Sequence, residues 1–439
     1  MIRTTGRPIA GVFIDSRSPV PEGLFVPIVA ARDGHDFIPA AIEGGAAATL
    51  VQRGRHPPAE QISVIEVDDT QAALTRLATA RCAAFEGPVV TISGSNGKTT
   101  TRAMVAGVLS SALETVLCTR GNLNNHLGVP LTVLGEPHDP DAMVVELGMS
   151  APGENDALAA IARPQVHVIT SVALEHLEFM KSIEAIAAAE AEPIARVRAG
   201  GCVVAPLDEP LLEPHLAAAA VDVLTFGHTA DCDVQILDVV VGARTRAKVR
   251  VGPFDPVELD LPLFGAHNAR NAAAALAVGH RLGLPLEAMV EALSSVRPVG
   301  DRGRPLEWSG HLLIADCYNA NPGSVEAALR SLAKTPCEGP KVAVLADMLE
   351  LGPTEAELHA ASGRLAAELG LDAVLGFGPL SLNTVQAAEA AGIRAEHFDT
   401  IDTLVLGLRH VFEGQPKGVA LLKGSRGMKL ERTLEVLGL

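Results

Sequence analysis

The segment VVTISGSNGKTTT, residues 89–101, constrains the fold of this chain more than any other. An apolar strand runs into two glycines, Gly94 and Gly97, and a helix begins at Lys98. Glycine lets backbone N–H groups converge, and a helix N-terminus adds a dipole that favours an anion. The segment predicts a phosphate-binding turn, with Lys98 directed at the β- and γ-phosphates and the Thr99 hydroxyl at Mg²⁺. The candidate nucleotide ligands are Ser93, Gly94, Ser95, Asn96, Gly97, Lys98, Thr99 and Thr100.

This turn is shorter than the common P-loop, because two residues rather than four separate Gly94 from Gly97. The alternative is an ordinary glycine-rich turn between a strand and a helix. That alternative leaves the Lys-Thr pair at the start of the helix as a coincidence, so we favour the phosphate site.

Composition narrows the class of protein. The 35 basic and 52 acidic residues give a net charge of −17, so the overall field does not favour nucleic acid or anionic membranes, and any phosphate must be bound locally. A hydrophobic content of 48% excludes disorder as the main state. The six cysteines form no C-x-x-C pair, which is typical of free thiols in a reducing compartment. Since we find neither an apolar leader nor an apolar run of about 20 residues, we expect a soluble, cytoplasmic protein.

The order of expected elements divides the chain into three α/β domains. Residues 1–86 hold short strands and helices and form a small N-terminal domain. Residues 87–303 contain continuous apolar strands, which indicate a mostly parallel, P-loop-type sheet with helices on both faces, and an antiparallel hairpin within 233–262. Residues 304–439 alternate four strands (HLLIAD, KVAVLA, DAVLGF and VALLKG) with helices, as in a Rossmann-like doubly wound sheet.

The short G-x-x-G-K-T-T loop resembles that of the Mur ligases, which form amide bonds with ATP. Further segments resembling this family are GNLNNHLGVPLTVL (121–134), VVELGMSAPGE (144–154), DCYNANPGSVEAAL (316–329), VLADMLELG (344–352) and LLKGSRGM (421–428). The resemblance runs from about Gly11 to the C-terminus, and the string Y-N-A-N-P separates the chain from folylpolyglutamate synthase. It implies that UDP-N-acetylmuramoyl-tripeptide is activated as an acyl phosphate and joined to D-alanyl-D-alanine for peptidoglycan synthesis. The implied cofactors are ATP and Mg²⁺, and a monomer is expected.

The same resemblance implies that Glu146 and His176 bind Mg²⁺ together with Thr99 and assist catalysis with Lys98. Read alone, Glu146 is a charge at a strand end and His176 a structural histidine. The main departure is at Glu190, where the family carries a lysine that becomes carbamylated. We expect Glu190 to supply the same negative charge to the metal site without needing CO₂; the alternative is a solvated glutamate in a weakened enzyme.

For ATP, the resemblance implies contacts from both sides of the boundary between the second and third domains. Asn268 and Asn271 match a family motif that contacts adenine, although an asparagine there is also a common helix N-cap. One arginine reaches phosphate, and we choose Arg302 over Arg304. Asp316 is expected at the ribose, and Tyr318 is expected to pack on the nucleotide.

The other substrates are assigned by resemblance as well. The UDP-substrate candidates are Asp15, Ser16, Arg17, Asp33, His35, Asn122, Asn124 and Asn125, for which solvated turns are the alternative. The acceptor candidates are Asn319, Asn321, Lys423 and Ser425; Asp347 and Glu350 are further candidates for the acceptor or for a domain interface. Two other functions stay open: a related ligase acting on another acid and amine, and a nucleotide-binding regulatory protein without catalysis.

Overall fold

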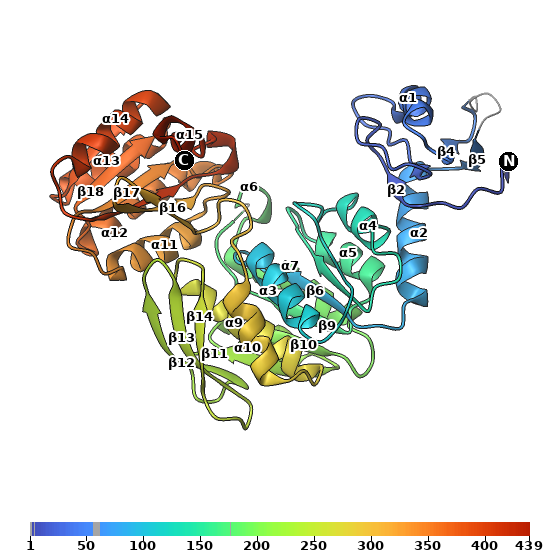
Figure 1. Ribbon diagram of the computed structural model, residues 1–439, viewed down its shortest axis with the longest axis horizontal. Helices are drawn as coiled ribbons and strands as arrows, with labels where there is room; N and C mark the ends of the chain where they lie inside the picture. The colour runs from blue at the N-terminus through green and yellow to red at the C-terminus, as the bar shows by residue number, and fades with distance from the viewer. Residues whose placement is uncertain (1, 4, 56–61, 176) are drawn as a thin grey trace.

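The computed structural model describes residues 2–3, 5–55, 62–175 and 177–439, and its strands form three sheets. Figure 1 shows the N-terminal sheet and the C-terminal sheet on opposite sides, both next to the central part of the chain. Each sheet lies within one of the expected blocks. We therefore propose domain boundaries at 1–86, 87–303 and 304–439.

The N-terminal sheet has the strand order β1-β5-β4-β3-β2, and β1 runs antiparallel to β5. Its strands are β1 (Ile2–Arg3), β2 (Val12–Phe13), β3 (Leu24–Phe25), β4 (Ala48–Gln52) and β5 (Ser63–Val67), and α1 spans Ile38–Glu43. Helix α2 (Thr70–Ala84) leads out of this part. Its Leu74 packs in the N-terminal core, whereas Ala78 and Cys82 pack in a core of the central part, so α2 is shared by both.

The central sheet contains nine strands in the order β14-β13-β12-β11-β10-β9-β6-β8-β7. The parallel strands are β6 (Val89–Ser93), β7 (Val116–Cys118), β8 (Ala142–Glu146), β9 (Val166–Ile169), β10 (Cys202–Pro206) and β11 (Asp222–Gly227). β12 (Val234–Val241) also runs parallel to β11 and forms the expected hairpin with β13 (Thr245–Val251). The expectation missed a third antiparallel strand, β14 (Val257–Leu261), which pairs with β13.

Helices cover both faces of the central sheet, as predicted. Val90 and Ile92 of β6 pack in the core that contains α3 (Lys98–Ser110), α9 (His267–Arg281) and α10 (Leu286–Ser295). The neighbouring Val89 faces the opposite side, where α4 (Gly128–Val133) and α5 (Glu154–Ala162) contribute to the core. α6 (Leu177–Met180), α7 (Ile183–Ala191) and α8 (Glu213–Ala217) complete the central helices. Because β6 runs parallel to both β8 and β9, the carboxyl ends of these three strands meet at one edge of the sheet.

The C-terminal sheet has six strands in the order β15-β16-β20-β17-β18-β19, and only β15 is antiparallel. The four expected strands are β16 (His311–Asp316), β17 (Lys341–Ala346), β18 (Ala373–Phe377) and β20 (Val419–Lys423). The edge strands β15 (Arg304–Trp308) and β19 (Arg394–Phe398) were not predicted, because charged residues leave neither of them with a continuous apolar run. One face carries α11 (Pro322–Lys334), α12 (Glu355–Glu368) and α13 (Ser381–Ala390); the other carries α14 (Ile401–Phe412) and α15 (Arg432–Leu437).

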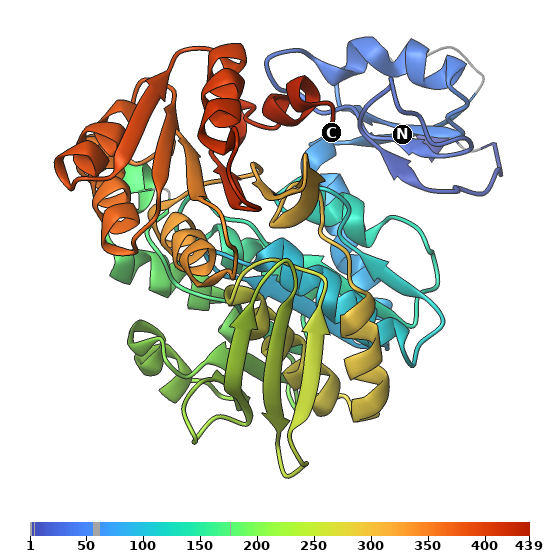
Figure 2. The ribbon, with the colours of Figure 1, turned by 60° about the vertical axis from the view of Figure 1, so that its left-hand side comes forward.

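Helix α11 also joins the C-terminal part to the central part. Val325 of α11 belongs to the same buried cluster as Val241 and Phe264 of the central part. Figure 2 shows this orange helix beside the central elements, while the blue N-terminal sheet stands apart from it. Among the described helices, none has both the length and the apolar character that a membrane crossing requires.

Candidate active site

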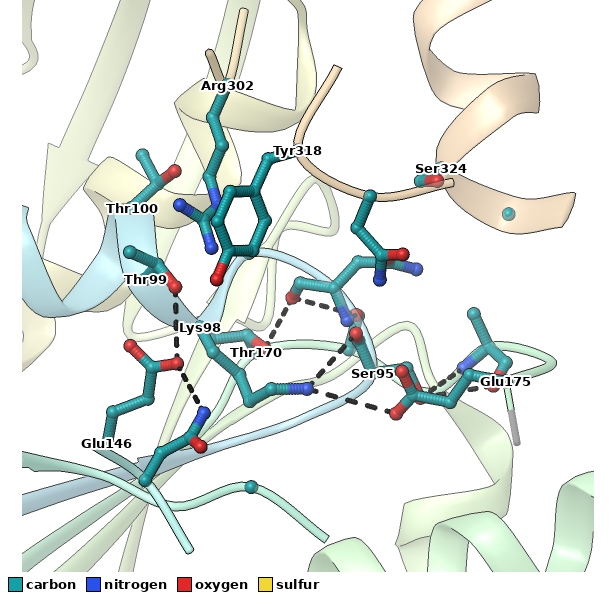
Figure 3. Close-up of a pocket in the computed structure, with 18 of the residues that line it drawn as sticks. Ser95, Lys98, Thr99, Thr100, Glu146, Thr170, Glu175, Arg302, Tyr318 and Ser324 are labelled. Atoms are coloured by element: carbon teal, nitrogen blue, oxygen red, sulfur yellow. Dashed lines mark hydrogen bonds and ion pairs between the residues drawn. The ribbon is translucent and has the colours of Figure 1, made fainter. Parts of the chain in front are cut away.

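A cavity of about 850 Å³ lies where the central and C-terminal parts meet. The phosphate turn, the G-N-L-N-N loop, the start of α9 and the Y-N-A-N-P segment all contribute to its wall. Figure 3 shows Lys98 and Thr99 of the turn in one view with Tyr318. The predicted site residues that line it are Ser95, Asn96, Gly97, Lys98, Thr99, Thr100, Asn122, Asn124, Asn125, Glu146, Asn268, Asn271, Arg302, Asp316, Tyr318, Asn319 and Lys423. Residues from distant parts of the sequence thus surround one space.

The phosphate turn is held open by its glycines and by the segment after β9. Gly94 and Gly97 have φ values of +118° and +87°, a region that residues with a Cβ rarely adopt. The hydroxyl of Thr170 donates to the carbonyls of Ser93 and Asn96, and Ser171 accepts the N–H of Asn96 at 3.0 Å. No side chain caps α3, so its first turn leaves a site for an anion.

Lys98 lies over its own turn. Its Nζ donates to the carbonyl of Gly94 at 2.5 Å and of Ser95 at 3.3 Å, and Glu175 Oε1 is 3.9 Å away. Burial lowers the pKa of Lys98, but the carboxylates of Glu175, Glu190 and Glu146 outweigh burial, so its pKa is raised. The side chain is therefore a cation at the mouth of the turn (Figure 3).

Glu146, at the end of β8, is buried among polar partners. Its Oε1 accepts from Thr99 Oγ1 at 3.2 Å and from Asn124 Nδ2 at 2.9 Å. Arg102 Nη1 lies 3.2 Å from Oε2 and also donates to the carbonyl of Gly121, yet Oε2 accepts no hydrogen bond. Glu146 thus joins the phosphate turn to the G-N-L-N-N loop, and the Arg102 cation lies next to the oxygen that accepts no hydrogen bond.

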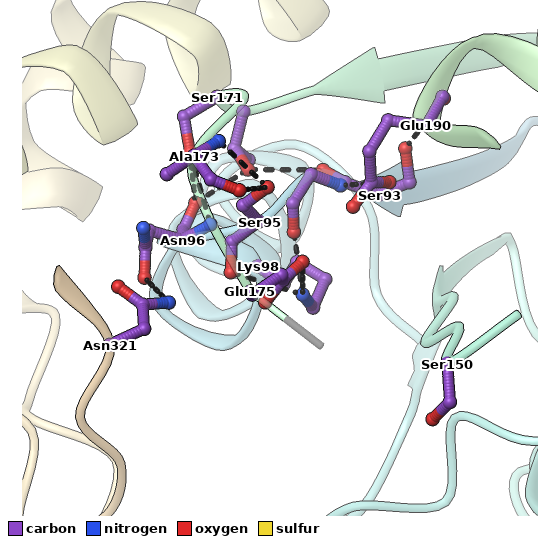
Figure 4. Close-up of polar contacts among 12 residues, drawn as sticks. Ser93, Ser95, Asn96, Lys98, Ser150, Ser171, Ala173, Glu175, Glu190 and Asn321 are labelled. Atoms are coloured by element: carbon purple, nitrogen blue, oxygen red, sulfur yellow. Dashed lines mark hydrogen bonds and ion pairs between the residues drawn. The ribbon is translucent and has the colours of Figure 1, made fainter. Parts of the chain in front are cut away.

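Glu190, at the end of α7, reaches the same turn from the other side. Figure 4 shows Glu190 beside the turn, where its Oε2 accepts the N–H of Gly94 at 2.7 Å. Oε2 also accepts from Asn155 Nδ2 at 3.1 Å, whereas Oε1 has no hydrogen-bond partner. Burial raises the pKa of Glu190, and it raises the pKa of Glu175 to about 8, against the opposing charge of Lys98. The carboxylate expected at the metal site is therefore buried beside the turn rather than solvated.

The expected metal set is only partly visible. His176 lies outside the described residues, and within the described ranges no three His, Cys, Asp or Glu side chains form a metal-binding cluster. Glu146 and Glu190 each keep one buried oxygen that accepts no hydrogen bond, which is costly and suits a cation; Glu146 lines the cavity, whereas Glu190 does not.

The nucleotide candidates at the boundary interact with one another. Neither Asn268 nor Asn271 is the cap of α9, whose N-cap is Ala266; Asn271 Nδ2 donates to Asn268 Oδ1 at 3.1 Å. The guanidinium of Arg302 lies 3.5 Å over the Tyr318 ring and lines the cavity. Arg304 pairs with Asp301 at 2.7 Å, outside the lining, which favours the choice of Arg302.

Comparison with known proteins agrees with this geometry. The model of the Mur ligase middle domain matches residues 92–279, and that of the Mur ligase glutamate ligase domain matches residues 302–426. The chain belongs to the Mur ligase family.

Two curated relatives and two solved structures extend this similarity to nearly the whole chain. A UDP-N-acetylmuramoyl-tripeptide–D-alanyl-D-alanine ligase of Bacillus subtilis is 37% identical, covering 98% of this chain and 93% of the relative. The Escherichia coli protein of the same name is 33% identical, covering 97% and 93%. MurF from Acinetobacter baumannii superposes with a TM-score of 0.86, at 29% identity over 97% of this chain and 92% of that one. MurF ligase from Thermotoga maritima in complex with ADP gives 0.85, at 28% identity over 97% and 96%.

Other candidates of this Mur ligase lie away from the cavity or bind each other. Arg17 pairs with Asp15 at 2.7 Å, and Asp33 caps a 3-10 helix (Gly34–Phe37) while bonding His35 Nδ1 at 2.7 Å. His35 Nε2 accepts the N–H of Gln52, so both its ring nitrogens are engaged. Ser16 also lies in the N-terminal part and does not line the cavity.

Some of the acceptor candidates of this Mur ligase line the cavity and others do not. Lys423 Nζ bonds Asp316 Oδ2 at 2.7 Å and the Asn319 carbonyl at 2.9 Å inside the cavity wall. Ser425 instead links the main chains of Leu349 and Ala320. Asp347 accepts from the N–H of Ser381 and Glu350 has a φ of +64°; neither lines the cavity.

Sequence analysis missed three buried residues of this Mur ligase: Arg102 beside Glu146, Glu175 beside Lys98, and His167 below the turn. Arg102 carried a detectable signal, since it follows Lys98 by one helical turn and so lies on the same face of α3. Glu175 directly precedes the predicted His176, whereas His167 carried no signal, because its partners Thr91 and Ser93 lie on another strand.

Proposed function

We propose that this Mur ligase adds D-alanyl-D-alanine to UDP-N-acetylmuramoyl-tripeptide, using ATP and forming an acyl phosphate on the way, in peptidoglycan synthesis. The observation that carries the proposal is the full-length similarity to relatives with that name, at up to 37% identity in the two described. It is supported by the Y-N-A-N-P segment, which lines the same cavity as the phosphate turn.

The chemistry follows from charge and position. The terminal carboxylate of the tripeptide attacks the γ-phosphorus of ATP, and ADP leaves; the amine of D-alanyl-D-alanine then attacks the acyl carbon, and phosphate leaves. Lys98 and the uncapped N–H groups at the start of α3 would bind the transferred phosphoryl group, whose negative charge is the main obstacle to the first step. Arg302, Asp316 and Tyr318 would orient the nucleotide, which brings the reacting atoms together.

Mg²⁺ fits the donor set. Glu146, Glu190 and the Thr99 hydroxyl would hold it, with His176 as a further candidate. When bound, it would neutralise charge on the nucleotide phosphates and polarise them toward attack. The residues themselves supply oxygen ligands of the kind that Mg²⁺ prefers.

Glu190 would provide the negative charge for which the family uses a carbamylated lysine, so we expect activity to be independent of bicarbonate. Its contact with the N–H of Gly94, at 2.7 Å, supports a role beside the phosphates. Glu190→Ala should lower turnover and raise the Mg²⁺ concentration required, whereas Glu190→Asp should retain part of both. An unchanged rate and Mg²⁺ dependence in Glu190→Ala would remove Glu190 from the site.

A coupled assay of ADP release tests the proposed function. We expect release only when ATP, UDP-N-acetylmuramoyl-tripeptide and D-alanyl-D-alanine are all present. Release with a different acid or amine, and none with this pair, would indicate a related ligase of other specificity. ATP binding without substrate-dependent release would indicate a regulatory protein. Parallel assays with diaminopimelate or lysine as the third residue identify the preferred tripeptide.

We also propose that the enzyme acts as a monomer in the cytoplasm. The cavity is built from residues of one chain, and ATP and nucleotide-linked precursors are cytoplasmic compounds. Light scattering after size exclusion, with and without nucleotide, measures the oligomeric state.

A further inference from the structure

Asn321 makes one hydrogen bond with each of its two polar side-chain atoms. Its Oδ1 accepts the N–H of Ser324 at 2.8 Å and caps α11, and Ser324 Oγ accepts the N–H of Asn321 in return. Its Nδ2 donates to Asn96 Oδ1 at 2.9 Å, and the side chain is buried. The second bond joins the C-terminal part directly to the phosphate turn (Figure 4).

Asn96 has little freedom once this bond is made. Its N–H donates to Ser171 Oγ, and its carbonyl accepts from Thr170 Oγ1 at 2.6 Å. The main chain of Asn96 is thus held from below by the segment after β9. Asn321 holds its side chain from above, because Asn96 Oδ1 is committed to the amide of Asn321.

The contact is close as well as directional. A Cβ on Gly323 would lie 3.0 Å from Ala173 Cβ and 3.6 Å from Asn96 Nδ2. The first turn of α11 therefore rests directly on the phosphate turn and its supporting segment. Because the cap makes Asn321 part of a rigid helix, a shift of α11 must either break this bond or carry Asn96 with it.

We propose that Asn321 is a positioning residue for the phosphate turn, rather than an acceptor-binding residue. Its amide holds Asn96, and with it the start of α3, whose first N–H groups have no side-chain cap and lie beside the cavity. The same bond keeps the C-terminal part, with Tyr318 and Asp316, over the nucleotide. The proposal rests on the proposed function in one respect: it assumes that the nucleotide occupies this cavity.

The test separates the two bonds of Asn321. Serine is as good an N-cap as asparagine, but it is too short to reach Asn96, so Asn321→Ser keeps the cap and removes the bond. Asn96→Ala removes the acceptor instead. Each variant should raise the Kd for MgADP, measured by calorimetry, about threefold to tenfold, the net effect of one hydrogen bond. The double variant should match either single variant, because the bond is lost only once.

Independent effects that multiply in the double variant, or a wild-type Kd in Asn321→Ser, would overturn the proposal.

Hydrogen exchange without nucleotide keeps this test distinct from that of the proposed function. In Asn321→Ser, the amides of residues 94–97 should exchange faster than in the wild type, while those at the centre of α11 stay unchanged. If the wild type bound no nucleotide, the proposed function would fail, but faster exchange would still support the bond. Unchanged exchange at 94–97 would refute it.

Discussion

His167 should make the central sheet less stable in mild acid. The side chain is fully buried in β9, with Nδ1 2.9 Å from Thr91 Oγ1 and Nε2 3.4 Å from Ser93 Oγ, both on β6. Burial lowers the pKa of His167 from 6.5 to about 3. Between these two values, the unfolded chain binds a proton that the folded chain does not, so stability falls as the pH falls.

The loss of stability can be calculated from the two pKa values of His167. Each pH unit below 6.5 costs about 1.4 kcal/mol, so lowering the pH from 7 to 5 should cost about 2 kcal/mol through His167 alone. His167→Gln keeps an amide donor and acceptor for Thr91 and Ser93 but does not titrate. The pH-dependent loss in the variant should therefore be smaller than in the wild type by that amount.

Hydrogen exchange of the β6 and β9 amides at pH 7 and pH 5, corrected for intrinsic rates, measures this difference. Fluorescence of the single tryptophan is unsuitable, because Trp308 lies in the C-terminal sheet. Equal pH-dependent losses in wild type and variant would refute the reasoning. An NMR titration that found the pKa of His167 near 6.5 in the folded protein would refute it as well.

Three further predictions concern the phosphate turn and its neighbours. Gly97→Ala should weaken nucleotide binding, because a residue with a Cβ pays roughly 1–2 kcal/mol at φ +87° and its Cβ would lie 2.5 Å from Asn271 Oδ1. Equal affinities of variant and wild type in calorimetry would contradict this. Arg102→Met should lower the free energy of unfolding by about 3–5 kcal/mol, since it leaves Glu146 buried without its cation. Adding Glu146→Gln should recover part of this loss, and an unchanged denaturation midpoint in Arg102→Met would show that the ion pair does not stabilise the fold. Lys98→Met should reduce kcat about 10²–10³-fold, and a wild-type kcat would exclude Lys98 from phosphate stabilisation.

The resemblance and the structure support different parts of the site. The motifs predict a shared site for Lys98, Glu146, Asn268 and Tyr318, and these residues do line one cavity. The same reasoning placed Asn321 and Ser425 among the acceptor residues, whereas their hydrogen bonds connect loops of the protein itself. A motif records which residue types occur together; it does not record which of them face the ligand.

The sequence by itself determined what depends on near neighbours. Within residues 89–101, the apolar run predicts the strand β6, and the two glycines after it predict the turn that leads into α3. The sequence also predicts that the buried strands run parallel, because continuous apolar runs alternate with helices along the chain. Only the tertiary structure decided which distant polar groups meet. Arg102 finds Glu146, His167 finds Thr91, and Asn96 finds Asn321 across 225 positions. Such pairs depend on how sheets and helices pack, and a hydrogen bond made at that distance leaves no periodic pattern in the chain.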